Sequence, residues 1–170
     1  MKILAIDPGY ERVGIAILDD ESGKEVLLYS DCILTARTDD FTERLHCIGV
    51  KVEDLIKTYT PDTMAIENLF FNTNQKTAMH VAEVRGALIF LAKNAHMRVV
   101  EYTPLQVKTA ISGYGRGKKE HLVKILRQLI SIEKDVACDD EYDAISIGLT
   151  CFVYQKSLFE KTRRMLPKTP

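Results

Sequence analysis

Hydrophobic and polar positions follow two different periods along this chain. Short apolar runs predict strands at residues 2–6, 13–18 and 25–34, and the turn-forming Pro8-Gly9 separates the first two. The third run mixes polar and apolar residues, so we expect it at an edge of the sheet. The first part of the chain therefore predicts three consecutive antiparallel strands.

After residue 40, apolar residues recur at three- and four-residue steps, which is helical spacing. The first such segment predicts a helix from about 41 to 59, which Pro61 ends. The elements expected after it are a strand at 63–66, a helix at 74–95, a strand at 98–102 and helices at 104–111, 118–130 and 139–154. Two strand–helix–strand units imply parallel pairing, with helices covering the sheet.

This order of elements is that of an RNase H-like α/β domain, with a mixed five-stranded sheet flanked by helices. The chain has 170 residues, of which 46% are hydrophobic and 28% charged. Such a composition suits one domain with a sizeable core and excludes intrinsic disorder. We expect the domain to occupy residues 1–155 and a basic, flexible C-terminal tail to occupy residues 156–170.

The cysteines and the apolar runs bear on where the protein works. No apolar run approaches the roughly 20 residues needed to span a bilayer, and the N-terminus lacks a signal-peptide pattern. The cysteines are scattered and form no C-x-x-C pair, so we interpret them as buried reduced thiols. They are Cys32, Cys47, Cys138 and Cys151. A cytoplasmic protein with no membrane contact is the expectation.

Four carboxylates lie where the predicted elements would bring them to one place. Asp7 follows the first strand and Glu67 follows the strand at 63–66, and ligand clefts form at the carboxyl ends of parallel strands. Asp140 and Asp143 are three residues apart at the start of the last predicted helix, so they share one side of it. Taken singly, each has an ordinary explanation as a turn, a strand end or a helix cap. Together they would repel one another unless cations neutralised them.

Oxygen ligands of this kind select hard ions such as Mg²⁺, with Mn²⁺ as a substitute. Two such ions about 3.5–4 Å apart would activate a water and stabilise the leaving 3′ oxygen in phosphodiester hydrolysis. We assign Asp7 as the bridge between both ions, with Glu67 on one side and Asp140 and Asp143 on the other. The residues thus predict a metal-dependent nuclease.

Five separated motifs, in the family's order, closely resemble the RuvC family of bacterial Holliday-junction resolvases. They are the run from Ile3 to Gly9, Gly14, Ala65-Ile-Glu67 with Phe70, Gln106-Val-Lys108, and the run from Asp140 to Ala144. The match covers about residues 1 to 155, and all four acidic positions of that family's site are occupied. The resemblance implies a homodimer that nicks two opposing strands of a four-way DNA junction symmetrically. It also implies a role in recombination and repair beside a branch-migration complex.

Basic residues gather in and just after a glycine-rich loop at 112–117. The net charge of −1 does not suggest a nucleic-acid binder, but a net sum hides how the charges are distributed. Phosphate contacts from such a loop would position a duplex without reading its sequence. The residues expected to contact DNA, two of them (Lys108 and Lys119) by the resemblance, are Lys108, Arg116, Lys118 and Lys119. For Lys124 and Arg127, a solvated helix face is an equally good explanation.

The helix predicted at 74–95 is apolar over more of its circumference than one sheet can cover. Ala78, Ala82 and Gly86 follow at four-residue steps and would let a second helix approach closely. A two-fold dimer seam and a buried helix of a monomer core both explain this pattern.

Three other functions fit parts of the pattern. Actin-like ATPases and sugar kinases share the opening Ile-Asp-x-Gly, but they need two related domains around the nucleotide. A non-catalytic junction-binding protein would be expected to lack a carboxylate, and none is lacking. An RNase H-like nuclease acting on structured RNA, as in pre-rRNA processing, stays open, although the C-terminal match with Asp140 and Asp143 favours the DNA resolvase.

Phe70 and Phe71 follow Glu67 closely, and the resemblance gives Phe70 the position that stacks on an unpaired base at the junction centre. Since such stacking is worth ~1–3 kcal/mol per base, we expect Phe70→Ala to slow junction cleavage by roughly tenfold. The thermal midpoint should change much less. Cleavage rates and melting curves of the variant test this, and an equal loss of activity and stability would instead identify Phe70 as a core residue.

Overall fold

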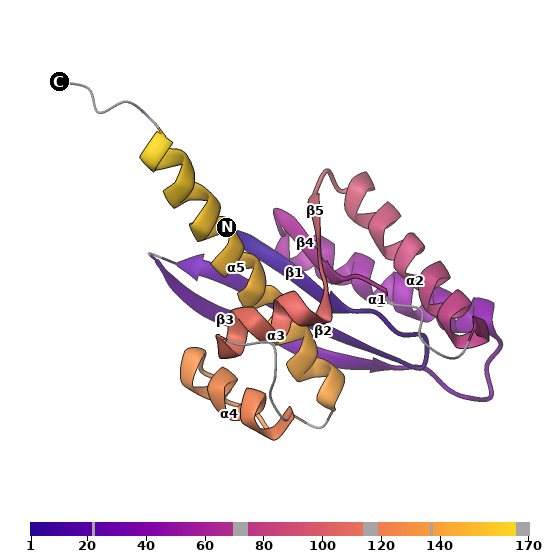
Figure 1. The fold of residues 1–170 in the computed structure, drawn as a ribbon. Coiled ribbons are helices and arrows are strands. Elements are labelled where there is room, and N and C mark those ends of the chain that lie inside the picture. The colour runs from indigo at the N-terminus through magenta and orange to yellow at the C-terminus, as the bar shows by residue number, and fades with distance from the viewer. Residues whose placement is uncertain (22, 70–74, 114–118, 137, 166–170) are drawn as a thin grey trace.

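A mixed five-stranded sheet forms the centre of the structure, which is a computed structural model (Figure 1). The strands are β1 (Lys2–Asp7), β2 (Arg12–Glu21), β3 (Lys24–Leu34), β4 (Thr63–Glu67) and β5 (Arg98–Tyr102). Their order is β3-β2-β1-β4-β5. β1 pairs antiparallel with β2 and β2 with β3, whereas β4 pairs parallel with both β1 and β5. The predicted mixed sheet, with the third strand at its edge, is confirmed.

The helices cover both faces of this sheet. They are α1 (Phe41–Tyr59), α2 (Gln75–Asn94), α3 (Pro104–Ser112), α4 (Lys119–Leu129) and α5 (Asp139–Met165). On one face, α1 and α2 pack their apolar residues against the side chains of Leu4, Ile6 and Ile15. On the other face, α5 packs against Ile3 and Ala5, with α3 and α4 outside it. The alternation of side chains along β1 thus supplies both cores.

The structure describes residues 1–21, 23–69, 75–113, 119–136 and 138–165. Four residues considered in the sequence analysis lie outside these ranges, namely Phe70, Phe71, Arg116 and Lys118. Among the helices that are described, none combines the length and the apolar character that crossing a bilayer requires.

The last helix is longer than predicted. We expected it to end at residue 154, but α5 continues to Met165, so residues 156–165 of the expected flexible tail are helical. The physical reason is local, because residues 156–165 include strong helix formers such as Leu158, Glu160 and Lys161. This segment contains no glycine or proline. The change from apolar to basic composition near residue 155 therefore does not mark the end of the helix.

Two glycines let α5 approach the sheet closely. A Cβ atom on Gly14 would lie 1.8 Å from the carbonyl oxygen of Asp140, and one on Gly148 would lie 2.3 Å from Cδ1 of Leu18. Gly14 is the partner of Asp7 in the β1–β2 ladder. The first turn of α5 therefore lies directly against the strand pair that carries Asp7.

We expect Gly14→Ala to destabilise the protein, because the added methyl group meets backbone that cannot rotate away. A displacement of this kind costs about 1–3 kcal/mol, or roughly 3–10 °C in the thermal midpoint. Gly49→Ala in α1 is the matched control, since a Cβ there meets nothing within 4 Å and alanine favours the helix. Circular dichroism melting curves of both variants decide the matter. A Gly14→Ala protein as stable as the parent would contradict the close contact.

Candidate active site

The four predicted carboxylates lie at one end of the sheet. Asp7 ends β1 and Glu67 ends β4, and these parallel neighbours pair Ile6 with Ile66, so the two acidic residues that follow are adjacent. Asp140 and Asp143 lie in the first turns of α5, whose backbone rests on Gly14. Three separate segments of the chain thus bring acidic side chains together.

The electrostatics of Asp7 show that all four groups interact. Burial, followed by the charges of Glu67, Asp143 and Asp140, raises the pKa of Asp7 from 3.8 to about 8 against an opposing effect of Lys119. Burial and the charge of Asp143 likewise raise the pKa of Glu67 to about 7, while Lys108 opposes the change. Without added positive charge, the site therefore holds protons near neutral pH.

Two basic side chains form ion pairs with the aspartates of α5. Nζ of Lys119, at the start of α4, donates to Oδ2 of Asp143 at 2.8 Å and lies 3.5 Å from Oδ2 of Asp139. Burial alone would lower the pKa of Lys119, but its hydrogen bond and charge attraction to Asp143, together with Asp139, raise it. On the other side, Nε of Arg12 lies 3.3 Å from Oδ2 of Asp140. Asp140 and Asp143 are thus each paired with a basic side chain.

The neighbouring aspartates of α5 differ in their surroundings. The side chain of Asp139 is 71% exposed, whereas that of Asp140 is 25% exposed. Asp140 also contributes to the raised pKa of Asp7. The residue directed at the buried carboxylates is therefore Asp140, and Asp139 lies towards solvent.

The carboxylate oxygens spread over a wider space than one ion requires. Within the described residues, no three of these four side chains bring oxygen atoms within 4.8 Å of one another. One group does meet that distance, formed by Cys32, Cys138 and Asp140.

A pocket of about 290 Å³ opens beside the carboxylates. Glu67 and Asp143 line it together with Lys108 and Lys119, the two lysines predicted to contact DNA near the scissile phosphate. A larger hollow of about 650 Å³ runs along the edge strand β3, but none of the four carboxylates lines it. The smaller pocket is therefore the one that brings two of the four carboxylates together with Lys108 and Lys119.

Side chains outside the predicted set support the site. Nε of Arg85 in α2 donates to the carbonyl oxygen of Glu67 at 3.2 Å, and Nη2 of Arg85 pairs with Glu101 of β5 at 2.5 Å. Arg85 thereby ties the end of β4 to its neighbouring strand. Arg12 and Arg85 could not be predicted from the sequence, because their roles depend on strand register and helix rotation, which no local spacing signals.

The motif Gln106-Val-Lys108 has a structural basis in α3. Oε1 of Gln106 accepts from the backbone N–H of Thr103 at 2.8 Å, and Oγ1 of Thr103 accepts from the N–H of Gln106 at 3.2 Å. This capping box fixes the first turn of α3, from which Lys108 reaches the pocket. Arg127 in α4, by contrast, donates to the hydroxyl of Tyr142 at 2.6 Å, so it is engaged in the fold.

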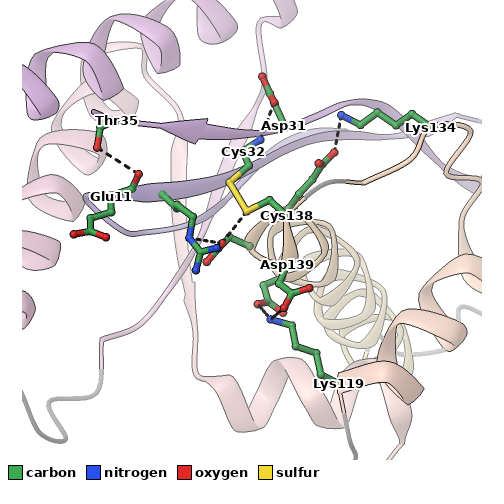
Figure 2. The surroundings of a disulfide bond; sticks show 12 residues. Glu11, Asp31, Cys32, Thr35, Lys119, Lys134, Cys138 and Asp139 are labelled. Carbon is green, nitrogen blue, oxygen red and sulfur yellow. Dashed lines mark hydrogen bonds and ion pairs between the residues drawn. A yellow bond between two sulfur atoms is a disulfide. The ribbon is translucent and has the colours of Figure 1, made fainter. Parts of the chain in front are cut away.

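The interpretation of the cysteines as four buried reduced thiols is wrong for three of them. Cys32 and Cys138 form a disulfide with their Cα atoms 6.3 Å apart (Figure 2). Cys47 is free but exposed, and Cys151 alone is both free and buried. The two bonded residues are 106 positions apart in the chain, so their proximity arises only when α5 packs beside β3.

Comparison with known proteins identifies the family of this chain. The family described as "Crossover junction endodeoxyribonuclease RuvC" matches residues 3–151. The RuvC protein of Moorella thermoacetica is 39% identical over 149 residues, which cover 88% of this chain and 89% of the relative. That of Alkaliphilus oremlandii is 40% identical over 149 residues, covering 88% and 91%.

Solved structures share the fold. The structure of Thermus thermophilus RuvC in complex with a Holliday junction substrate has a TM-score of 0.82 at 26% identity, covering 92% of this chain and 96% of that one. The yeast mitochondrial Holliday junction resolvase Ydc2 has a TM-score of 0.71 at 14% identity, covering 93% and 80%, and shows likeness of fold alone. The expected RNase H-like architecture is thereby confirmed.

We expect the metal-free protein to lose stability as the pH rises. The pKa of Asp7 is higher in the folded chain than its ordinary value of 3.8, so its contribution is present below about pH 4 and lost as the pH passes about 8. Asp7→Asn removes the buried charge and should raise the thermal midpoint near pH 8 by about 3–6 °C. Melting curves in a chelator, recorded across this range, measure the effect.

The control for this prediction is Asp139→Asn, which removes an exposed carboxylate from the first turn of α5. It should not raise the midpoint. Equal pH dependence in the parent protein and in Asp7→Asn would show that Asp7 carries no buried charge.

Proposed function

This chain belongs to the RuvC family of crossover junction endodeoxyribonucleases, and on that basis we propose how its own residues cut a Holliday junction. It is a Holliday junction resolvase, a nuclease of DNA recombination. The Thermus thermophilus relative was solved with a Holliday junction substrate. A four-way DNA junction is accordingly the substrate that we assign to this chain.

We assign the catalytic metal site to Asp7, Glu67, Asp140 and Asp143. The observation that carries this assignment is the convergence of the other three charges on the buried carboxylate of Asp7, whose pKa they and burial raise to about 8. Full ionisation at neutral pH requires added positive charge, and four carboxylates are ligands suited to hard ions. Two Mg²⁺ ions, for which Mn²⁺ can substitute, are proposed because four carboxylates are more than one such ion commonly takes from a protein. When bound, such ions supply an activated water and stabilise the leaving oxygen.

Lys119 and Lys108 are proposed to hold the scissile phosphate. Lys119 donates to Asp143, and both lysines line the pocket that Glu67 and Asp143 share. A phosphate that enters this pocket competes with Asp143 for the ammonium group of Lys119, because both are anions. The lysines thus balance the acidic site before substrate binds and orient the DNA backbone afterwards. By sequence, Arg116, Lys118 and Phe70 are proposed as further DNA contacts.

We propose a homodimer with α2 at its seam. Met79 and Phe90 of this helix are each 63% exposed, which is unusual for large apolar side chains on one helix. Two sites related by a two-fold axis suit symmetric nicking of opposing strands. Cytoplasmic location and action beside a branch-migration complex belong to the same proposal.

The decisive experiment compares a synthetic immobile four-way DNA junction, a linear duplex and a structured RNA, each with and without Mg²⁺. We expect paired, symmetric nicks in the junction alone, and only with the metal. Cleavage of the structured RNA instead would identify the protein as a nuclease of structured RNA. Cleavage in the presence of a chelator would contradict the proposed dependence on a metal ion.

Asp7→Asn should abolish cleavage and spare binding. Loss of the central ligand removes several kcal/mol of transition-state stabilisation, so we expect a rate at least roughly 10³-fold lower. Junction affinity in a gel-shift assay should change little, because basic residues provide it. Asp54→Asn, an exposed residue of α1, is the control that should cleave normally. Full activity of Asp7→Asn would refute the assignment.

A further inference from the structure

The disulfide lies next to a proposed metal ligand. Sγ of Cys138 lies 2.8 Å from Oδ2 of Asp140, and this oxygen lies within 4.8 Å of both sulfur atoms. Cys32 belongs to β3, whereas Cys138 immediately precedes α5, as Figure 2 shows. Both cysteine residues are partly exposed, so a small reagent can reach them.

The sheet register explains what this bond joins. Asp7 of β1 pairs with Gly14 of β2, and Gly14 pairs with Cys32 of β3. These three residues form one row across the sheet, and the first turn of α5 crosses this row with the carbonyl of Asp140 against Gly14. The disulfide therefore links Cys138, two residues before Asp140, to Cys32 at the β3 end of this row.

We propose that Cys32 and Cys138 form a redox-sensitive clamp whose oxidised state prepares Asp140 to bind a cation. This inference rests on the proposed role of Asp140 as a metal ligand. In the dithiol state, the S–H group of Cys138 is placed to donate to Oδ2 of Asp140. That hydrogen bond occupies an oxygen that a cation needs. In the disulfide state, Sγ carries no hydrogen, so Oδ2 loses this donor and keeps its ion pair with Arg12, which a cation can replace.

The oxidation has a balanced route through a small-molecule disulfide such as oxidised glutathione. One protein sulfur attacks it, and a mixed disulfide forms as one small thiol leaves. The second protein sulfur then displaces the other small thiol. In total two S–H bonds are lost and one S–S bond forms, while the oxidant takes up two electrons and both protons as two thiols.

Other contacts keep the segment before α5 in place when the disulfide is open. Nζ of Lys134 donates to the carbonyl oxygen of Ser30 in β3 at 2.5 Å and pairs with Glu141 of α5 at 2.7 Å. Reduction therefore loosens the first turn of α5 and returns a donor to Asp140 without unfolding the domain. Reversible change in one folded protein is the expected behaviour.

The test compares protein treated with oxidised glutathione and protein treated with a thiol reductant. Cys47→Ser is the matched control, because Cys47 is an exposed free cysteine in α1. We expect peptide mass analysis to find the Cys32–Cys138 link in the oxidised sample of both proteins. Calorimetric titration without DNA should show Mn²⁺ binding roughly tenfold tighter after oxidation, as for other groups that contact metal ligands. The thermal midpoint should rise by about 5–10 °C.

Cys138→Ser removes both the link and the S–H group beside Asp140, so the Mn²⁺ affinity of this variant should not depend on the redox treatment. Absence of the link after oxidation, or equal Mn²⁺ affinity in the two states of the parent protein, would overturn the clamp. Asp140→Asn separates this proposal from the one it rests on. If that variant binds Mn²⁺ as tightly as the parent, the metal assignment of Asp140 fails, whatever the state of the cysteines.

Discussion

The contact between the backbone of Asp140 and Gly14 is the constraint on which the site depends. Asp7 and Glu67 are placed by neighbouring parallel strands, so any sheet with this topology would bring them together. Asp140 and Asp143 arrive from the far end of the chain, and they reach Asp7 only because Gly14 has no side chain. Gly148 allows the same close approach further along α5, where the helix packs against Leu18. Close approach of one helix thus turns a common strand-end arrangement into a four-carboxylate site.

That proximity creates an electrostatic cost, which the protein offsets with its own basic side chains. Burial and like charges raise the pKa of Asp7 and Glu67, while Arg12 and Lys119 pair with the outer aspartates. The same lysine lines the pocket for an anionic substrate. The site is therefore organised around charge before any ligand is present, since each carboxylate has either a proton or a cationic neighbour.

Much of the fold followed from the sequence, because hydrophobic periodicity reports directly which side of an element is buried. Helix α1 has the predicted bounds, and strand β5 likewise. Asp7 and Glu67 were predictable because the ends of parallel strands meet, whereas Asp140 and Asp143 were predictable from their three-residue spacing at the start of a helix. The disulfide was missed because Cys32 and Cys138 become neighbours through tertiary packing, and Arg85 because its partners depend on how α2 is rotated. The end of α5 was misplaced since a basic segment was taken for a tail.

The length of α5 affects how the protein can be handled. Its first turns carry Asp140 and Asp143, its middle is held against the sheet at Gly148, and its far end projects beyond the domain (Figure 1). With 27 residues it extends roughly 40 Å. An affinity tag, fluorophore or surface linker attached after Met165 would begin about that distance along α5 from its first turn. Immobilisation for single-molecule work can therefore use that end of α5, away from the four carboxylates.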